Sequence, residues 1–364
     1  MRIMYIATCD FAASGLGIRK KVYAQVRSLE QAGLECFLVT CQENCLVLIQ
    51  KEEIQQRAIF FSTQEMYEKI LNIVQEYQIE AVYIRFLTSN LFFYNFIKQL
   101  RKQKTEMILE FPCTPYDDSI DPLTLAEDKY YRNRMWKYVK FSTNYNEFKK
   151  VYHISSISLA NGVDFEIIPP RIENDNKDIV LLGVASMTIW HGFDRIIRGI
   201  HNYYKEGNVK EKVYIRFVGT GPEYHNYRKL ADQLGVNEYV SFLGDKFGDE
   251  LTNEFNMANM AIGSLGIHRI NLKSVSTIKT KEYCSRGLPF FIAYDEIDFD
   301  SKEKFILKFE PDESDIDVHK IVEFYHFYQK NCSSAELRKY AEERFSWDTI
   351  MQPVVTYINQ CIGR

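Results

Sequence analysis

The most informative stretch of the chain is Met257–Phe291, which reads MANMAIGSLGIHRINLKSVSTIKTKEYCSRGLPFF. It begins as an apolar strand-like segment and continues through a polar loop. A short helix is then predicted to start near Ser276 and to stop at Gly287, just before Leu288-Pro289. Strand, loop and helix form the repeating unit of a parallel sheet wrapped by helices. The stretch therefore predicts an α/β fold, with its loop where such folds bind ligands.

The helix predicted in this stretch carries Lys279 and Glu282, three residues apart. The first turn of a helix has unpaired N–H groups that attract phosphate, and Lys279 adds a cation beside them. Glu282 can accept hydrogen bonds from two neighbouring hydroxyls, such as those of a ribose. A diphosphate next to a ribose is the common part of a nucleotide-sugar, so the stretch predicts a nucleotide-sugar site.

The same alternation of strands and helices runs through most of the chain, and it restarts near Asp178. Helices are predicted over residues 18–31, 91–102, 192–206, 224–234 and 249–257. Two doubly wound sheets follow from this pattern. We expect one domain over 1–168 and a second over 169–344, with a helix over 345–364 that crosses back to the first. The segment Ile167-Ile168-Pro169-Pro170 and the polar residues after it are the expected hinge.

Length, charge and cysteine content exclude several classes of protein. A chain of 364 residues can form two domains, and a formal charge of −4 argues against general nucleic-acid binding. The eight cysteines contain no C-x-x-C pair, so we expect them to be reduced and buried, without a metal site.

The amino-terminal segment and the hydropathy pattern bear on location. MRIMYIATC is typical of a first strand and not of a secretory signal, and no apolar window approaches the ~18 residues of a membrane span. We expect a cytoplasmic protein, with peripheral attachment to the inner face of the membrane as an open alternative.

Three motifs carry a resemblance to a known family. They are N-G-V-D at Asn161–Asp164, G-x-G-P-E at Gly219–Glu223 and K-x-x-E-Y-x-x-x-G-L-P at Lys279–Pro289. With them the chain resembles the retaining GT-B glycosyltransferases (glycosyl transferases group 1, family 4-like) that build bacterial capsule, O-antigen and exopolysaccharide. The resemblance covers most of the chain. It implies two Rossmann-like domains facing across a cleft, with the donor nucleotide in the second domain near Gly219 and Gly221.

The chain departs from the family pattern at two places in the second domain. Relatives carry a carboxylate eight residues before the position of Glu282, where this chain has Ser274. Either Ser274 binds the sugar hydroxyls, or His268 and its loop neighbours Arg269 and Lys273 do. Relatives also clamp the diphosphate with an Arg and a Lys. Ala185 or Ser186 falls near the first position and His191 near the second, so His191 is expected to bind phosphate when protonated; a helix-entry cap is the alternative.

Two loops of the first domain are candidates for substrate contact. Gly15 and Gly17 lie between the first strand and the first helix, where the resemblance brings substrate close to the backbone; a tight turn is the alternative. The third glycine of a dinucleotide fingerprint is missing, which argues against NAD. Glu110 stands near the family's histidine position. We expect Glu110 or Asp117 to bind acceptor hydroxyls, with a structural turn as the alternative.

The resemblance implies transfer of a sugar from a nucleoside diphosphate, expected to be UDP, to a saccharide on a polyprenyl-diphosphate lipid, without a metal or other cofactor. Cations and aromatic residues alternate near residues 129–140, and Arg132, Lys137 and Lys140 are predicted to dock at an anionic membrane; a solvated helix face is the alternative. Two other functions stay open. One is a nucleotide-sugar epimerase, and the other is a non-catalytic partner or scaffold.

Overall fold

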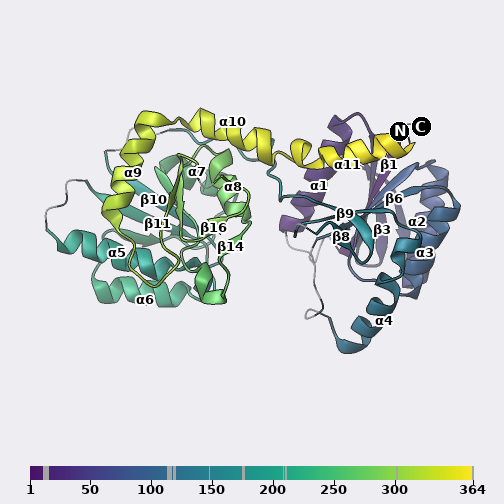
Figure 1. Cartoon of the computed structure of the whole chain (residues 1–364), viewed down its shortest axis with the longest axis horizontal. Helices are drawn as coiled ribbons and strands as arrows, with labels where there is room; N and C mark the ends of the chain where they lie inside the picture. Colours follow the sequence, from purple (N-terminus) through teal and green to yellow (C-terminus); the bar gives the residue numbers. More distant parts are fainter. Residues whose placement is uncertain are drawn as a thin grey trace. The chain divides into compact units, whose positions relative to one another are not determined.

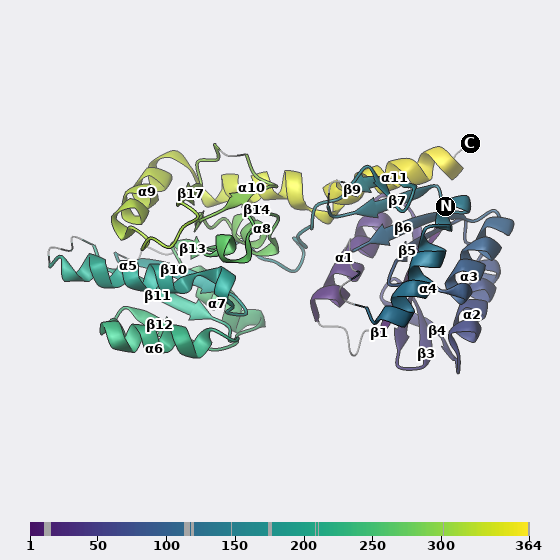
Figure 2. The same cartoon turned by 60° about the horizontal axis from the view of Figure 1, so that its bottom comes forward.

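The structure is a computed structural model that describes residues 1–10, 16–112, 117, 120–146, 148–173, 177–207, 209, 211–300 and 302–362. The chain divides into two compact units (Figures 1 and 2). Unit 1 comprises Met1–Ala160 and Trp347–Arg364, and unit 2 comprises Asn161–Ser346. Each unit is a sheet with helices on both faces, so the predicted α/β class with two doubly wound sheets is confirmed.

Unit 1 has, among the described residues, a nine-stranded sheet in the order β4-β3-β2-β1-β5-β6-β7-β9-β8. The six central strands, β2-β1-β5-β6-β7-β9, are parallel to one another. At the two edges, β3, β4 and β8 pair antiparallel with their neighbours. The strands are β1 (Arg2–Asp10), β2 (Glu35–Gln42), β3 (Cys45–Gln50), β4 (Glu53–Ile59), β5 (Ala81–Arg85), β6 (Glu106–Phe111), β7 (Phe141–Asn144), β8 (Lys150–Val151) and β9 (Ile154–Ser158).

The helices of unit 1 cover both faces of its sheet. They are α1 (Leu16–Gln31), α2 (Thr63–Glu76), α3 (Leu91–Lys102), α4 (Pro122–Arg132), the short 3-10 helix η2 (Met135–Lys137) and α11 (Trp347–Ile362). Alternate residues of β1 point to opposite faces. Met4 and Ile6 pack in the core with α2 and α3, while Ile3 and Tyr5 pack with α1 and α11. Figure 2 shows α1 on one side of the sheet and the α2–α3 pair on the other.

Unit 2 contains, in its described part, a six-stranded sheet in the order β12-β11-β10-β13-β15-β17, with parallel pairing throughout. Its strands are β10 (Ile179–Val184), β11 (Val213–Val218), β12 (Val240–Phe242), β13 (Met260–Ile262), β15 (Phe290–Ile292) and β17 (Ile306–Lys308). A separate two-stranded parallel ribbon is formed by β14 (Ser274–Val275) and β16 (Asp295–Glu296).

The helices of unit 2 also lie on both faces. They are η3 (Ile189–His191), α5 (Phe193–Lys205), α6 (Tyr224–Leu234), α7 (Gly248–Met257), η4 (Ile267–Ile270), α8 (Ile278–Ser285), α9 (Val318–Asn331) and α10 (Ser334–Phe345). Leu181 packs in one core with α5, α6 and α9, whereas its neighbour Leu182 packs in the other with α7, α8 and α10. All parallel strands of the sheet therefore end at one edge, where the candidate site lies.

Two details differ from the sequence-based expectations. The segment expected as a hinge is bonded to unit 2, since Arg338 donates to the carbonyl of Ile168 and Arg171 donates to that of Ala258. The described cysteines form no disulfide with one another, but they are not all buried: Cys361 is exposed, and Cys9, Cys45 and Cys332 are half-buried. The reason is that these residues lie at element ends or edges. Cys113 lies outside the described residues.

None of the helices in the described part of the chain is both long enough and apolar enough to cross a bilayer.

Candidate functional site

The carboxyl ends of β10 and β11 in unit 2 are held together through two glycines. Gly219 has φ +110° and Gly221 has φ +142°, a range that favours glycine. A Cβ on Gly219 would lie 2.0 Å from the carbonyl oxygen of Ala185, and one on Gly221 would lie 2.6 Å from the backbone of Met187. The G-x-G-P-E motif thus packs closely against the loop after β10. This contact fixes the position of the loop, on which Ser186 is exposed.

His191 lies in η3, directly after this loop, and its ring is buried. Its Nδ1 accepts the backbone N–H of Thr188 at 3.0 Å, so the neutral ring carries its proton on Nε2. Burial, and then the nearby ammonium of Lys279, lower the pKa of His191 to about 3. In the chain without a ligand, desolvation and a neighbouring cation both disfavour the imidazolium form of His191. A neutral N–H donor is what the structure offers.

Lys279 lies in the first turn of α8, at the carboxyl ends of the unit 2 strands. The residue as a whole is half-buried, yet its Nζ is fully covered and has no hydrogen-bond partner within the described chain. Burial lowers the pKa of the Lys279 ammonium to about 7. An unpaired buried cation costs free energy, which a bound anion would return. The arrangement is suited to an anionic ligand.

Residues of β16 and of the loop after it hold the start of α8 in place. Glu296 is buried and accepts hydrogen bonds from the backbone N–H of Thr277 at 3.1 Å and from the hydroxyls of Thr277 and Thr280, each at 2.8 Å. Burial raises the pKa of Glu296. Lys281, which has no exposed surface, pairs with Asp298 at 2.5 Å. These contacts hold the helix start rigidly, which keeps Lys279 in place.

Glu282 lies one turn beyond Lys279 on the same helix. Its Oε1 accepts from Arg286 at 3.1 and 3.3 Å, and its side chain remains 28% exposed. Arg286 is buried and stacks on Phe255, 4.1 Å from the ring centre. Arg286 therefore orients the carboxylate of Glu282. The second carboxylate oxygen of Glu282 stays available for hydroxyl groups of a ligand.

The loop between β13 and α8 holds the other predicted residues of unit 2. His268 Nε2 lies 2.8 Å from Glu313, and its Nδ1 is buried without a partner in the described chain. Arg269 is fully engaged, with two hydrogen bonds to Asp194 and two to Glu313. Hydrogen bonds from Arg269 lower the pKa of Glu313 to about 2. Arg269 therefore anchors the loop, whereas Ser274 is exposed on β14.

In unit 1, Glu110 is the residue before the last in β6 and is completely buried. It accepts hydrogen bonds from Tyr145 at 2.6 Å and Tyr5 at 2.8 Å, and Arg85 and Lys21 pair with it at 3.1 and 3.6 Å. Burial alone would raise the pKa of Glu110, but Lys21, Arg85 and the two phenols lower it below its usual value. Glu110 is an ionised carboxylate whose hydrogen-bonding capacity is largely used within unit 1.

Asp117 and the basic cluster behind it are paired with each other. Asp117 forms ion pairs with Arg132 at 2.8 Å and Lys129 at 2.9 Å. Arg132 also pairs with Asp128 and is only 5% exposed. The expectation that Arg132 docks at a membrane is therefore wrong, because a buried and doubly paired guanidinium cannot reach a bilayer. Lys137 and Lys140 are exposed.

The structure brings together Lys279, His191 and the glycine loops at one edge of unit 2, and it places Glu110 and Asp117 in unit 1. Gly17 is part of α1, and Gly15 lies outside the described residues. Sequence reasoning missed Glu296 and Asp298, since nothing in a single strand-loop segment signals a contact with a helix start. Among the described residues, no group of three or more His, Cys, Asp or Glu side chains could hold a metal ion.

Comparisons with known proteins establish the fold. No family model and no curated protein matches the sequence. Solved structures match over nearly the whole chain. A glycosyltransferase from Rickettsia africae shares 11% identity at a TM-score of 0.66, covering 99% of this chain and 98% of that one. Sucrose-phosphate synthase from Thermosynechococcus elongatus shares 12% identity at 0.63, covering 100% and 99%.

HepE from Anabaena, solved in complex with UDP, likewise shares 12% identity at a TM-score of 0.63, with 99% of this chain and 100% of that one covered. Each of these proteins is similar to the present chain in the arrangement of its strands and helices, at identities where the fold is what the likeness establishes. The chain therefore has the GT-B fold of two Rossmann-like units that these glycosyltransferases share.

Proposed function

We propose that the chain is a retaining glycosyltransferase that moves a sugar from a nucleoside diphosphate, UDP, to a saccharide hydroxyl. The observation that carries this proposal is the covered Nζ of Lys279 at the start of α8, which has no hydrogen-bond partner among the residues that the structure describes. The GT-B fold supports it, since the neighbouring structures include HepE bound to UDP and to UDP-glucose. A cation without an internal partner suits the diphosphate of such a donor.

The donor would lie along the carboxyl edge of the unit 2 sheet. Its diphosphate would meet Lys279 and the Nε2–H of His191, and its ribose hydroxyls would meet the free oxygen of Glu282. The base would pack near Asp245 to Phe247, where Phe247 is 72% exposed. The sugar hydroxyls would meet Ser274 or His268. Positive charge in this arrangement comes from Lys279 and helix starts, so the proposal includes no metal.

Leaving-group stabilisation is the chemistry this arrangement supplies. When the bond from the anomeric carbon to the diphosphate breaks, negative charge grows on the departing phosphate oxygen. The Nζ of Lys279 is covered by protein atoms, and electrostatic stabilisation is strongest where water is excluded. The departing diphosphate would take the proton of the attacking hydroxyl on the same face of the sugar, so that the anomeric configuration is retained. Lys279 is thus the residue on which catalysis depends most.

The acceptor is proposed to be a lipid-linked saccharide in surface polysaccharide synthesis, at the inner face of the membrane. Support comes from four exposed residues of unit 1, which are Tyr130, Trp136, Lys137 and Lys140. Their cations and aromatic rings would contact an anionic membrane without the buried Arg132. Vesicles with anionic lipid should pull down the protein at low salt, and Lys137→Glu with Lys140→Glu should abolish this. Pull-down that survives both changes would refute the proposed membrane face, and absent pull-down by the wild type would favour a soluble acceptor.

Release of UDP tests the proposed activity. Incubation with a panel of UDP-sugars and saccharide acceptors should release UDP only when both substrates are present, and EDTA should not stop the reaction. Interconversion of the donor sugar without release of UDP would show an epimerase instead. Binding of UDP without either reaction, across donors and acceptors, would point to a non-catalytic partner.

A further inference from the structure

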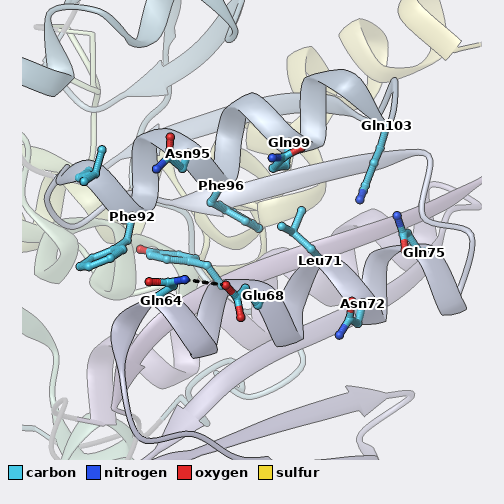
Figure 3. Close-up of a pocket in the computed structure, with 12 residues that line it drawn as sticks. Gln64, Glu68, Leu71, Asn72, Gln75, Phe92, Asn95, Phe96, Gln99 and Gln103 are labelled. Atoms are coloured by element: carbon cyan, nitrogen blue, oxygen red, sulfur yellow. Dashed lines mark hydrogen bonds between the residues drawn. The ribbon is translucent and has the colours of Figure 1, made fainter.

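A groove of about 620 Å³ runs between α2 and α3 on unit 1 (Figure 3). Each helix contributes one face, since its lining residues recur three or four positions apart. The lining consists of Gln64, Tyr67, Glu68, Leu71, Asn72, Gln75, Leu91, Phe92, Asn95, Phe96, Gln99 and Gln103. From Gln64 to Gln75 the α2 side extends over roughly 17 Å, at ~1.5 Å per residue.

The chemistry of this lining differs from that of an ordinary helix surface. Six of its twelve residues are Asn or Gln, and one, Glu68, is charged. Charged residues make up 26% of the whole chain, so about three would be expected by proportion. No lysine, arginine or histidine lines the groove. A phosphate or nucleotide therefore has no cation to pair with here, which argues for a neutral ligand.

The amides are largely unused by the protein. Gln64 donates to Glu68 at 2.8 Å, but the side chains of the other five amides make no hydrogen bond within the described chain. Gln103 adds a second observation, because its Oε1 is covered and lacks a partner there. A covered acceptor without a donor costs free energy unless a ligand or water supplies one. Each amide offers both donors and an acceptor, which is the pattern that a hydroxyl group matches.

The groove also has an apolar floor. Phe92 is 39% exposed at one end, and Tyr67 and Leu71 are half-buried along the groove. The buried Phe96 supports this floor by stacking on Tyr67, with ring centres 4.8 Å apart. Figure 3 shows Leu71 and Phe96 pointing toward one another, with Gln75 and Gln103 at one end and Phe92 and Gln64 at the other. A floor of ring and methyl groups under a rim of amides suits a sugar, whose C–H face is apolar and whose edge carries hydroxyls.

We propose that the groove between α2 and α3 binds a neutral oligosaccharide chain, with C–H faces on Phe92, Tyr67 and Leu71 and hydroxyls on the amides. The site lies within unit 1 and requires no nucleotide. It goes beyond the proposed function, which assigns the donor to unit 2 and a membrane face to Lys137 and Lys140, by giving unit 1 a separate site for a glycan chain several sugars long. A chain bound there would stay with the protein between successive additions.

Calorimetry with neutral hexasaccharides tests this proposal, using maltohexaose, cellohexaose, mannohexaose and chitohexaose at low millimolar concentrations. At least one should bind the wild type. Gln75→Ala with Gln99→Ala should raise its Kd at least tenfold, as should Phe92→Ala, because all three side chains are exposed and removable without opening the core. Gln329→Ala, which removes an exposed amide of α9, is the matched control and should leave the Kd unchanged.

Three results would overturn the proposal. No binding by any of the four hexasaccharides would exclude the ligand class, and binding that survives the double variant would place the site elsewhere. A dimer in light scattering that dissociates in the double variant would show that a second copy of the chain fills the groove. UDP binding, measured on the same samples, should be equal in all variants. Its absence from the wild type would refute the donor proposal alone, so the two failures can be told apart.

Discussion

The two lysines of α8 differ in how the fold treats their charges. Lys281 is fully buried, pairs with Asp298 at 2.5 Å and donates to Ser276. Lys279, two residues earlier, has a covered Nζ without any partner in the described chain. Both charges are costly to bury, but only one is compensated by the protein itself. The difference indicates that Lys281 serves the fold, whereas Lys279 is kept for a ligand.

A similar contrast separates the two units. In unit 1 the buried carboxylate of Glu110 has two cations and two phenols around it. At the matching edge of unit 2 the buried ammonium of Lys279 has no such shell, and burial lowers its pKa to about 7. A carboxylate that is already neutralised and hydrogen-bonded within the protein contributes little to substrate binding. We therefore assign the stronger electrostatic role to unit 2.

The largest expected effect is on stability at Lys281. Lys281→Met should lower the free energy of unfolding by about 3 kcal/mol, since removing one partner of a buried pair leaves the other charge uncompensated. Asp298 keeps 17% of its side-chain surface exposed, which places the loss at the lower end of the usual range. Urea denaturation measures it. A loss below about 1 kcal/mol would mean that the pair contributes little.

Lys279→Met should have the opposite sign in the same assay. The change removes an unpartnered amine and keeps an apolar stem of similar length, so we expect a gain of about 1–2 kcal/mol in the free energy of unfolding. If the variant were instead as destabilised as Lys281→Met, Lys279 would be structural, and the contrast between the two lysines would disappear.

The effect of pH on the affinity for UDP should be smaller than either of these two changes in the free energy of unfolding. The free protein holds Lys279 with a pKa of about 7, and bound diphosphate favours the ammonium, so affinity should fall as pH rises from about 6 to 8. The fall approaches but does not exceed about tenfold per pH unit. Lys279→Met provides the correction for titration of UDP itself. Identical profiles for the two proteins would exclude Lys279 as the titrating group.

Much of the fold could be predicted from the sequence because its signals are local. The bounds predicted for α3 and α6 agree with the structure, where Asn90 caps α3 and Gly235, with φ +65°, ends α6. The β3–β4 hairpin was missed. Its turn contains Lys51 and Glu52 at φ +50° and +65°, so it lacks the glycine that normally marks such a turn.

The candidate site could be predicted only in part. Lys279 and Glu282 belong to a local motif, and the sequence singles them out. The covered state of the Lys279 Nζ, in contrast, results from packing between separate segments, and so does the burial that lowers the pKa of His191. Glu296 and Asp298 support α8 from a distant ribbon strand and its loop. Such contacts depend on tertiary structure, which single-sequence patterns do not contain.

The most direct test of the account is the affinity for UDP of the wild type and of Lys279→Met, measured by calorimetry at pH 6, where the lysine is charged. Lys229→Met removes the same charge from the exposed face of α6 and serves as the control. We expect the wild type and the control to bind UDP equally, and Lys279→Met to bind it tenfold to a hundredfold more weakly, a loss of about 1.4–2.7 kcal/mol in binding free energy. Equal affinity in all three proteins, or no binding by the wild type, would contradict this expectation.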